Sequence, residues 1–208
     1  RQDIAFEPGE AVSQRHIGAL LASRFDAVVT VDPHLHRIAS LSEVMPGCDA
    51  VVLSAAGLIG TWVAQYIERP LLLGPDEESA QWVREAARHC SPVADHGWCH
   101  KQRNGDFDVH VTLPPALDCQ GRAVVLIDDM ASTGRTLVAA ARLALAAGAG
   151  SVDVAVTHAL FVGAAIGELH AAGVRHVWST DCVAHASNAI SVVAMLARAV
   201  ERVGDESG

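Results

Sequence analysis

The sequence predicts an α/β fold in which helices flank a doubly wound parallel sheet. Short aliphatic segments, of which residues 124–127 are the clearest, alternate along the chain with stretches of helical spacing. Four consecutive aliphatic residues indicate a strand buried on both faces, as strands of parallel sheets are. The composition agrees, because 50% of the 208 residues are hydrophobic, only 4% are aromatic and 17 are Gly. Alternation of this kind favours a sheet whose strands run in one direction.

Each element follows from a local pattern. Runs of β-branched and aliphatic residues between turn residues predict strands at 26–31, 50–54, 71–73, 109–113, 124–127, 152–157 and 174–178. Apolar residues recurring every three to four positions predict helices at 11–24, 58–67, 77–89, 137–147, 164–172 and 188–200. Residues 95–108 contain two glycines and several charges, which predicts a mobile loop, and we expect residues 201–208 to be frayed.

Charge, hydropathy and cysteine usage restrict the class of function. A formal net charge of −9 argues against a nucleic-acid-binding surface, which needs a basic field. No apolar run is long enough to cross a bilayer, and no signal peptide is recognisable. The five cysteines are odd in number and contain no C-x-x-C pair, which favours a reducing, cytoplasmic setting. We therefore expect a cytoplasmic protein with neither nucleic acid nor membrane as a partner.

The most informative segment follows the strand at 124–127. Asp128 and Asp129 stand where that strand emerges, and the loop into the next helix consists of Ser132, Thr133, Gly134, Arg135 and Thr136. Two adjacent carboxylates can accept hydrogen bonds from the two cis hydroxyls of a ribose. The hydroxyls and the amides around Gly134 can hold an anion at the positive end of the helix. The segment predicts a site for a ribose 5-phosphate moiety. The alternative is an ordinary junction whose acids cap the helix. Neither a Walker loop nor a dinucleotide fingerprint is present.

Two further loops follow predicted strands and carry possible metal ligands. Asp32, His34 and His36 lie after the first strand, where an acid and two imidazoles can bind a metal or contact phosphates. The alternative is a histidine satisfied within a turn beside Pro33. Asp76 lies after the third strand, where it can meet a Mg²⁺–pyrophosphate group directly or through water. Its alternative role is to cap the next helix.

Two polar segments add candidate contacts for a polyphosphate. Lys101 and Arg103 lie in the predicted loop, where a pair of cations can neutralise charge that develops during transfer. The alternative is a solvated surface pair. Residues 1–3 begin a polar stretch before the first helix, and the alternative there is an exposed tail. A zinc site near His96 lacks a fourth ligand at a plausible spacing, which argues against structural zinc.

Taken in order, these segments resemble those of the ribose-phosphate pyrophosphokinase family, whose members have a type I phosphoribosyltransferase-like fold. The resemblance implies that Arg1, Gln2 and Asp3 contact ATP. It implies that His34 and Asp76 serve Mg²⁺ and the transferred pyrophosphate, and that Lys101 and Arg103 are catalytic. It assigns ribose-5-phosphate binding to Asp128, Asp129, Ser132, Thr133, Gly134, Arg135 and Thr136. The loop at 132–136 lacks an acid that many members have, and so approaches the general phosphoribosyltransferase pattern.

The implied activity is a transferase reaction of nucleotide biosynthesis. A kinase of this family transfers the pyrophosphoryl group of ATP to the 1-hydroxyl of ribose 5-phosphate and yields phosphoribosyl pyrophosphate and AMP. The resemblance also implies Mg²⁺ as cofactor and a homo-oligomer. Two alternatives remain: a phosphoribosyltransferase that consumes phosphoribosyl pyrophosphate, and a catalytically inactive regulatory homologue.

The resemblance also predicts the domain organisation. Residues 1–45 correspond to the remainder of an incomplete N-terminal phosphoribosyltransferase-like domain, joined by the helix at 188–200. Residues 46–187 correspond to the C-terminal domain that carries the ribose-5-phosphate loop. We therefore expect a chain truncated at its N-terminus, which keeps a folded second domain but forms little product alone.

Overall fold

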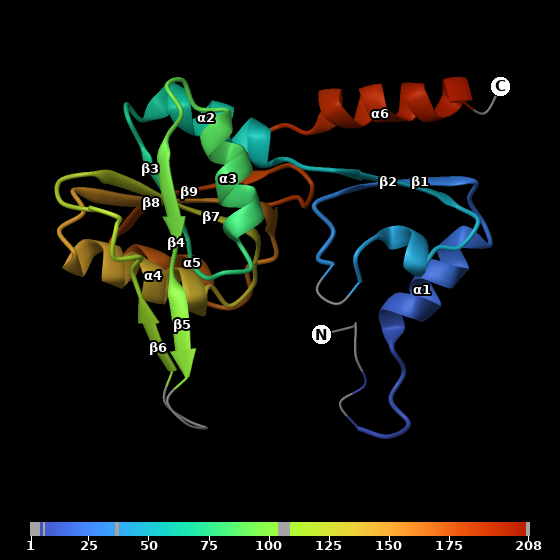
Figure 1. Ribbon diagram of the computed structural model, residues 1–208, viewed down its shortest axis with the longest axis horizontal. Helices are drawn as coiled ribbons and strands as arrows, with labels where there is room; N and C mark the ends of the chain where they lie inside the picture. Colours follow the sequence, from blue (N-terminus) through green and yellow to red (C-terminus); the bar gives the residue numbers. More distant parts are fainter. Residues whose placement is uncertain (1–4, 6, 36–37, 104–108, 207–208) are drawn as a thin grey trace. The chain divides into compact units, whose positions relative to one another are not determined.

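The computed structural model describes residues 5, 7–35, 38–103 and 109–206, and it divides into two compact units. The first unit combines Arg1–Ser54 with Val193–Gly208, and the second is Ala55–Val192 (Figure 1). The division follows Ser54 rather than residue 45, because strand β2 (Asp49–Leu53) pairs with β1 (Ala27–Val31) in the first unit.

The second unit is built on a six-stranded sheet with the order β10-β9-β8-β7-β3-β4. Every strand pair in it is parallel, which confirms the predicted doubly wound α/β class. The strands are β3 (Leu71–Gly74), β4 (Asp95–Trp98), β7 (Ala123–Ala131), β8 (Ser151–Ala159), β9 (Val174–Thr180) and β10 (Asn188–Ile190).

Helices cover both faces of this sheet. Helices α2 (Ala56–Tyr66) and α3 (Ala80–Arg88) pack on one face, and α4 (Arg135–Ala146) and α5 (Ala165–Ala171) on the other (Figure 1). Successive side chains of a strand point to opposite faces, and the strands here supply apolar residues to both. Thus Leu72 packs with α2 and α3, whereas Leu73 packs on the side of α4 and α5.

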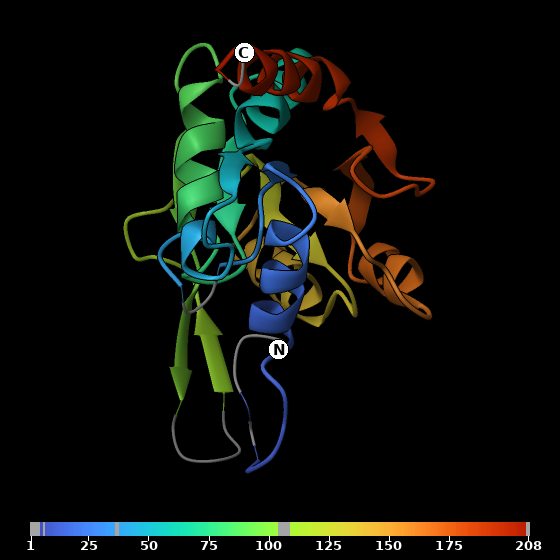
Figure 2. The same cartoon turned by 90° about the vertical axis from the view of Figure 1, so that its right-hand side faces the viewer.

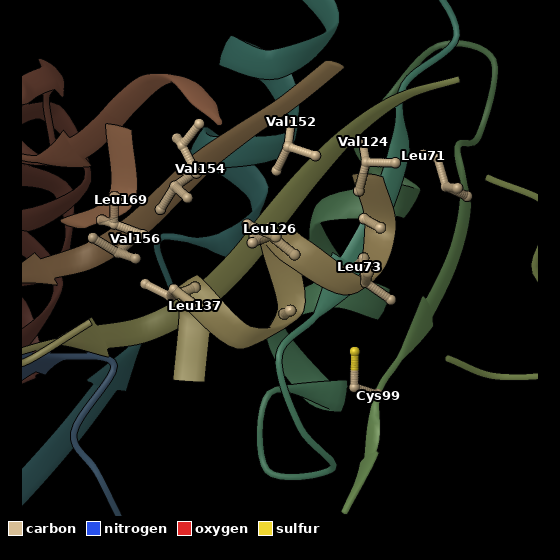
Figure 3. Packing of buried hydrophobic residues seen from close by; sticks show 14 of the residues in the cluster. Leu71, Leu73, Cys99, Val124, Leu126, Leu137, Val152, Val154, Val156 and Leu169 are labelled. Atoms are coloured by element: carbon tan, nitrogen blue, oxygen red, sulfur yellow. The ribbon is translucent and has the colours of Figure 1, made fainter. Parts of the chain in front are cut away.

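The α4–α5 face holds the larger core cluster. Figure 3 shows Leu126 and Leu137 within this cluster, with Val156 and Leu169 beside Leu137. These four side chains are at most 1% exposed. Burial of an aliphatic side chain of this size contributes about 1.5–3 kcal/mol. The cluster therefore fixes the junction between β7 and α4, which is the segment that the sequence singled out.

A hairpin extends away from the sheet in both views of the molecule (Figures 1 and 2). It consists of β5 (His100–Arg103) and β6 (Val109–Thr112), which pair antiparallel. The predicted loop over 95–108 is therefore wrong for residues 95–98, which form β4, and for residues 100–103, which form β5. Gly97 does not break β4, because its missing side chain leaves room for Pro114, whose Cγ would lie 3.0 Å from an added Cβ.

The described residues of the first unit form a parallel two-stranded sheet, β1 with β2, and three helical segments. These segments are α1 (Ser13–Ala22), the short 3₁₀ helix η1 (Leu41–Glu43) and α6 (Val193–Glu206). Its core gathers Leu41, Val44 and Met45 against apolar residues of α1 and the two strands. The prediction of a helix from residue 188 is wrong, because 188–190 pair with β9 as β10. Residues 201–206 were expected to fray but continue α6.

Within the described ranges, no helix is both long and apolar enough to cross a membrane.

Candidate active site

The predicted site residues of the second unit meet at one edge of the sheet. Strands β3 and β7 are parallel neighbours, with Leu73 beside Leu126. Asp76 follows β3, and Asp128 and Asp129 lie in the last part of β7. Three carboxylates from two adjacent strands therefore lie at the carboxyl edge, where open α/β sheets bind their ligands.

Asp128 and Asp129 are held by backbone amides of their own segment. The Asp129 N–H donates to Oδ1 of Asp128 at 3.0 Å, and the Met130 N–H donates to Oδ1 of Asp129 at 2.7 Å. Asp129 is only 3% exposed, whereas Asp128 is half-buried. Backbone amides of the strand thus help to fix the orientation of both carboxylates.

The carboxylates at this edge affect one another's protonation. Burial, followed by the charges of Asp129 and then Asp76, raises the pKa of Asp128 well above its usual range. The contribution of Asp76 shows that the two strand ends act on each other. A ligand hydroxyl or a cation that met these oxygens would relieve this repulsion.

The loop between β7 and α4 turns at a glycine. Gly134 has φ +70° and precedes the first residue of α4. The first helical bond runs from the Val138 N–H to the Gly134 carbonyl at 2.8 Å. The amides of residues 135–137 therefore have no acceptor within the helix, as is usual in a first turn. These amides and the helix dipole form a surface suited to an anion.

The hydroxyl-bearing residues of the loop are open to solvent. Ser132, Thr133 and Thr136 are exposed, as is Arg135. A second loop supports them, since the Val162 N–H donates to the Ser132 carbonyl at 3.2 Å. This contact could not be predicted from the sequence, because a backbone amide has no residue-type signature.

The loop that carries Asp76 is tightly packed. The Glu78 N–H donates to Oδ1 of Asp76 at 3.1 Å, and the Ser79 hydroxyl donates to the Asp76 carbonyl at 2.6 Å. At Gly74 an added Cβ would collide with Oγ of Ser79 and would lie 2.9 Å from Cβ of Trp98. The turn from β3 into this loop therefore requires glycine for steric reasons. Asp76 also caps its own turn, so both roles that the sequence suggested for it remain compatible.

The other predicted residues are less constrained by the structure. Residues 1–3 lie outside the described ranges. Lys101 and Arg103 belong to β5, and only their backbone is described. His34 belongs to the first unit and Asp76 to the second. Among the described residues, no group of three or more His, Cys, Asp or Glu is placed to hold a metal ion.

Comparison with known proteins agrees with the geometry. Residues 52–170 match the family described as "Phosphoribosyl transferase domain". A ribose-phosphate pyrophosphokinase of Methanopyrus kandleri is 37% identical over 205 residues, which make up 98% of this chain and 68% of that relative. The chain belongs to the ribose-phosphate pyrophosphokinase family. This membership confirms the resemblance found in the sequence and identifies an enzyme of the transferase class.

Further relatives in the family support the same assignment. Ribose-phosphate pyrophosphokinase 2 of Archaeoglobus fulgidus is 36% identical over 95% of this chain and 69% of its own length. The crystal structure of phosphoribosylpyrophosphate synthetase from Mycobacterium smegmatis superposes with a TM-score of 0.76. That match covers 99% of this chain and 68% of the other at 24% identity, so it establishes the fold.

Proposed function

We propose that the protein transfers the β,γ-pyrophosphoryl group of ATP to the 1-hydroxyl of ribose 5-phosphate, which yields phosphoribosyl pyrophosphate and AMP. The main structural support for this function is the geometry of the β7–α4 segment in this protein, which belongs to the ribose-phosphate pyrophosphokinase family. This segment places two carboxylates, held by backbone amides, in the last part of β7, and the helix that follows begins directly after a left-handed glycine. This arrangement offers acceptors for a sugar diol beside donors for a phosphate.

The ribose would be held by Asp128 and Asp129. Each carboxylate accepts hydrogen bonds from one or both cis hydroxyls, and a charge-assisted bond of this kind contributes about 1.5–3 kcal/mol. The 5-phosphate would lie against residues 132–136, at the amides of the first turn of α4. This pose fixes the 1-hydroxyl at one point, and in-line phosphoryl chemistry depends on such positioning.

Mg²⁺ fits the charge of this edge. Burial is the main cause that raises the pKa of Asp128, and the negative charges of Asp129 and then Asp76 add to it; a divalent cation would offset these charges. Mg²⁺ in phosphate sites uses one or two carboxylates, and substrate phosphates and water complete its coordination. The absence of three clustered protein ligands among the described residues is therefore compatible with Mg²⁺. We assign Asp76 and His34 as its protein contacts; when bound, the ion neutralises phosphate charge.

The remaining assignments concern ATP and the transition state. Arg1, Gln2 and Asp3 would contact ATP, and Lys101 with Arg103 would stabilise charge that develops on the transferred group. The first unit corresponds to part of an N-terminal phosphoribosyltransferase-like domain, and the second to the C-terminal domain. We also propose a homo-oligomer in the cytoplasm. All five cysteines are free, which suits a reducing compartment.

A phosphoribosyltransferase that consumes phosphoribosyl pyrophosphate is the second candidate. Residues 52–170 match the phosphoribosyl transferase domain, which is compatible with this second candidate. The match alone does not separate the two reactions, because both would use the same sugar-phosphate site. The identity to ribose-phosphate pyrophosphokinases over nearly the whole chain favours the kinase reaction.

Substitution of a ribose acid tests the assignment of the site. Asp129→Asn keeps the shape of the side chain but removes its charge. We expect ribose 5-phosphate to bind roughly tenfold or more weakly, while inorganic phosphate binds as before. Isothermal titration calorimetry measures both affinities. Equal affinity of the variant and the wild type for ribose 5-phosphate would remove Asp129 from the site.

A further inference from the structure

The hairpin that carries Lys101 and Arg103 is joined to the Asp76 loop at its base. The outgoing arm begins with Cys99, which is fully buried and packs in the core cluster near Leu73 (Figure 3). Its N–H donates to the Gly74 carbonyl at 2.8 Å. This bond ties the first residue of the arm to the last residue of β3, two positions before Asp76. The core therefore holds the start of the arm.

The next residue forms a side-chain link between the same two segments. His100 donates from Nδ1 to Oε1 of Glu77 at 3.1 Å. Glu77 directly follows Asp76, and His100 directly precedes Lys101. This hydrogen bond thus connects the neighbour of a proposed pyrophosphate contact to the neighbour of a proposed catalytic cation. The two residues are 23 positions apart in sequence.

We propose, on the basis of the function proposed above, that His100 and Glu77 form a positioning pair that sets Lys101 against the Asp76 loop for pyrophosphoryl transfer. Neither side chain touches the substrates in this role. The hairpin's other arm is held separately, because Val111 and Leu113 pack against the core cluster. The outgoing arm has Cys99 as its core anchor, and the pair extends that anchorage by one residue toward Lys101.

The expected effect of losing the pair on kcat follows from how far the two side chains are exposed to solvent. The side chains of His100 and Glu77 are 41% and 66% exposed, so solvent and salt screen their attraction. An exposed pair of this kind shifts an equilibrium roughly two- to fivefold. Loss of the pair should therefore lower kcat by roughly two- to fivefold. The KM for ribose 5-phosphate should stay within about twofold, because the sugar site lies on β7 and α4. General unfolding would instead lower the concentration of active enzyme, and calorimetry would detect it.

A double-mutant cycle tests this pair directly. Glu77→Ala, His100→Ala and the double variant are compared in the protein expressed from its complete reading frame. The double variant should have the same kcat as either single variant, because each removes the same link. Glu68→Ala is the matched control: it removes an exposed carboxylate before β3, at the opposite edge of the sheet, and should keep the wild-type kcat.

Amide hydrogen exchange gives a second, independent readout. Exchange at residues 99–103 should be faster in both single variants than in the wild type and in Glu68→Ala. Unchanged kcat, or single effects that multiply in the double variant, would overturn the positioning role. A wild type that forms no phosphoribosyl pyrophosphate would refute the proposed function instead. In that case equal exchange at residues 99–103 in all four proteins would refute the link itself.

Discussion

Gly134→Ala tests the role of the backbone conformation in the loop at residues 132–136, because it leaves the hydroxyl-bearing side chains of that loop unchanged. Gly134 has φ +70°, and an L-residue in this left-handed region costs about 1–2 kcal/mol. Sterics add little, since the nearest atom to an added Cβ is Cβ of Ala165 at 3.7 Å. The variant should lose about 1–2 kcal/mol of stability if the loop keeps its shape, a fall in Tm of about 2–8 °C. If the loop shifts instead, ribose 5-phosphate should bind about five- to thirtyfold more weakly.

Gly167→Ala is the matched control for this substitution. Gly167 lies inside α5, and nothing lies within 4 Å of an added Cβ. Alanine is favoured over glycine in a helix interior by about 0.5–1 kcal/mol, so this variant should be slightly more stable and bind as the wild type does. Differential scanning calorimetry and titration with ribose 5-phosphate measure the two effects. A Gly134→Ala variant with wild-type Tm and wild-type affinity would refute the assignment of a strained, phosphate-facing turn.

Three further substitutions test the charges and the packing around the site. Asp128→Asn should weaken ribose 5-phosphate binding yet raise stability at neutral pH by about 0.5–2 kcal/mol. The folded wild type binds a proton on Asp128 more tightly than the unfolded chain does, so it loses stability as pH rises from about 3.8 through the raised pKa of this group. The advantage of the variant should therefore vanish near pH 4 in chemical denaturation, and an advantage independent of pH would exclude this cause. Lys101→Ala should raise the activation free energy of pyrophosphoryl transfer by about 2–4 kcal/mol, while ribose 5-phosphate binds normally. Stopped-flow kinetics measures turnover, and titration measures binding. Normal turnover would mean that Lys101 is a solvated surface residue without a catalytic role. Gly74→Ala should lose about 1–3 kcal/mol in urea titration, because its Cβ would overlap Ser79 and press on Trp98; wild-type stability would mean that the Asp76 loop can move aside.

The central part of the fold could be predicted because its signals are local. The aliphatic run before Asp128 predicts a doubly buried strand, and the structure extends it into β7 over Ala123–Ala131. The residues immediately around Gly134 are enough to predict the turn there and the helix after it. The alternation of strands with helices then determines the parallel sheet with little further information.

The hairpin was missed because its stability does not come from local propensity. Gly97 and a charged stretch resemble a loop in sequence, yet residues 95–98 pair with β3 as an edge strand, and Pro114 packs on Gly97. The polar sequence of β5 pairs with β6 in a separate two-stranded sheet. The pairing of β4 with β3 joins residues distant in sequence, which patterns of single residues do not encode.

Contacts between polar groups that are distant in sequence could not be predicted from the sequence either. Asp153 is fully buried within the apolar run of β8, and it accepts hydrogen bonds from Arg175 at 2.6 Å and from the backbone and ring of His176. The register between β8 and β9 shifts at this point. The pair of Glu77 and His100 is of the same kind. Each residue type suggests a charge, but only the folded sheet brings the partners together.

The stoichiometry of the reaction tests the central claim most directly. The protein expressed from its complete reading frame is incubated with ATP, Mg²⁺ and ribose 5-phosphate, and the products are followed by phosphorus NMR. Transfer of an intact pyrophosphoryl group predicts AMP and phosphoribosyl pyrophosphate in equal amounts, with neither formed when ribose 5-phosphate is omitted. Formation of ADP in place of AMP, or consumption of added phosphoribosyl pyrophosphate with a purine or pyrimidine base while ATP stays intact, would contradict the account.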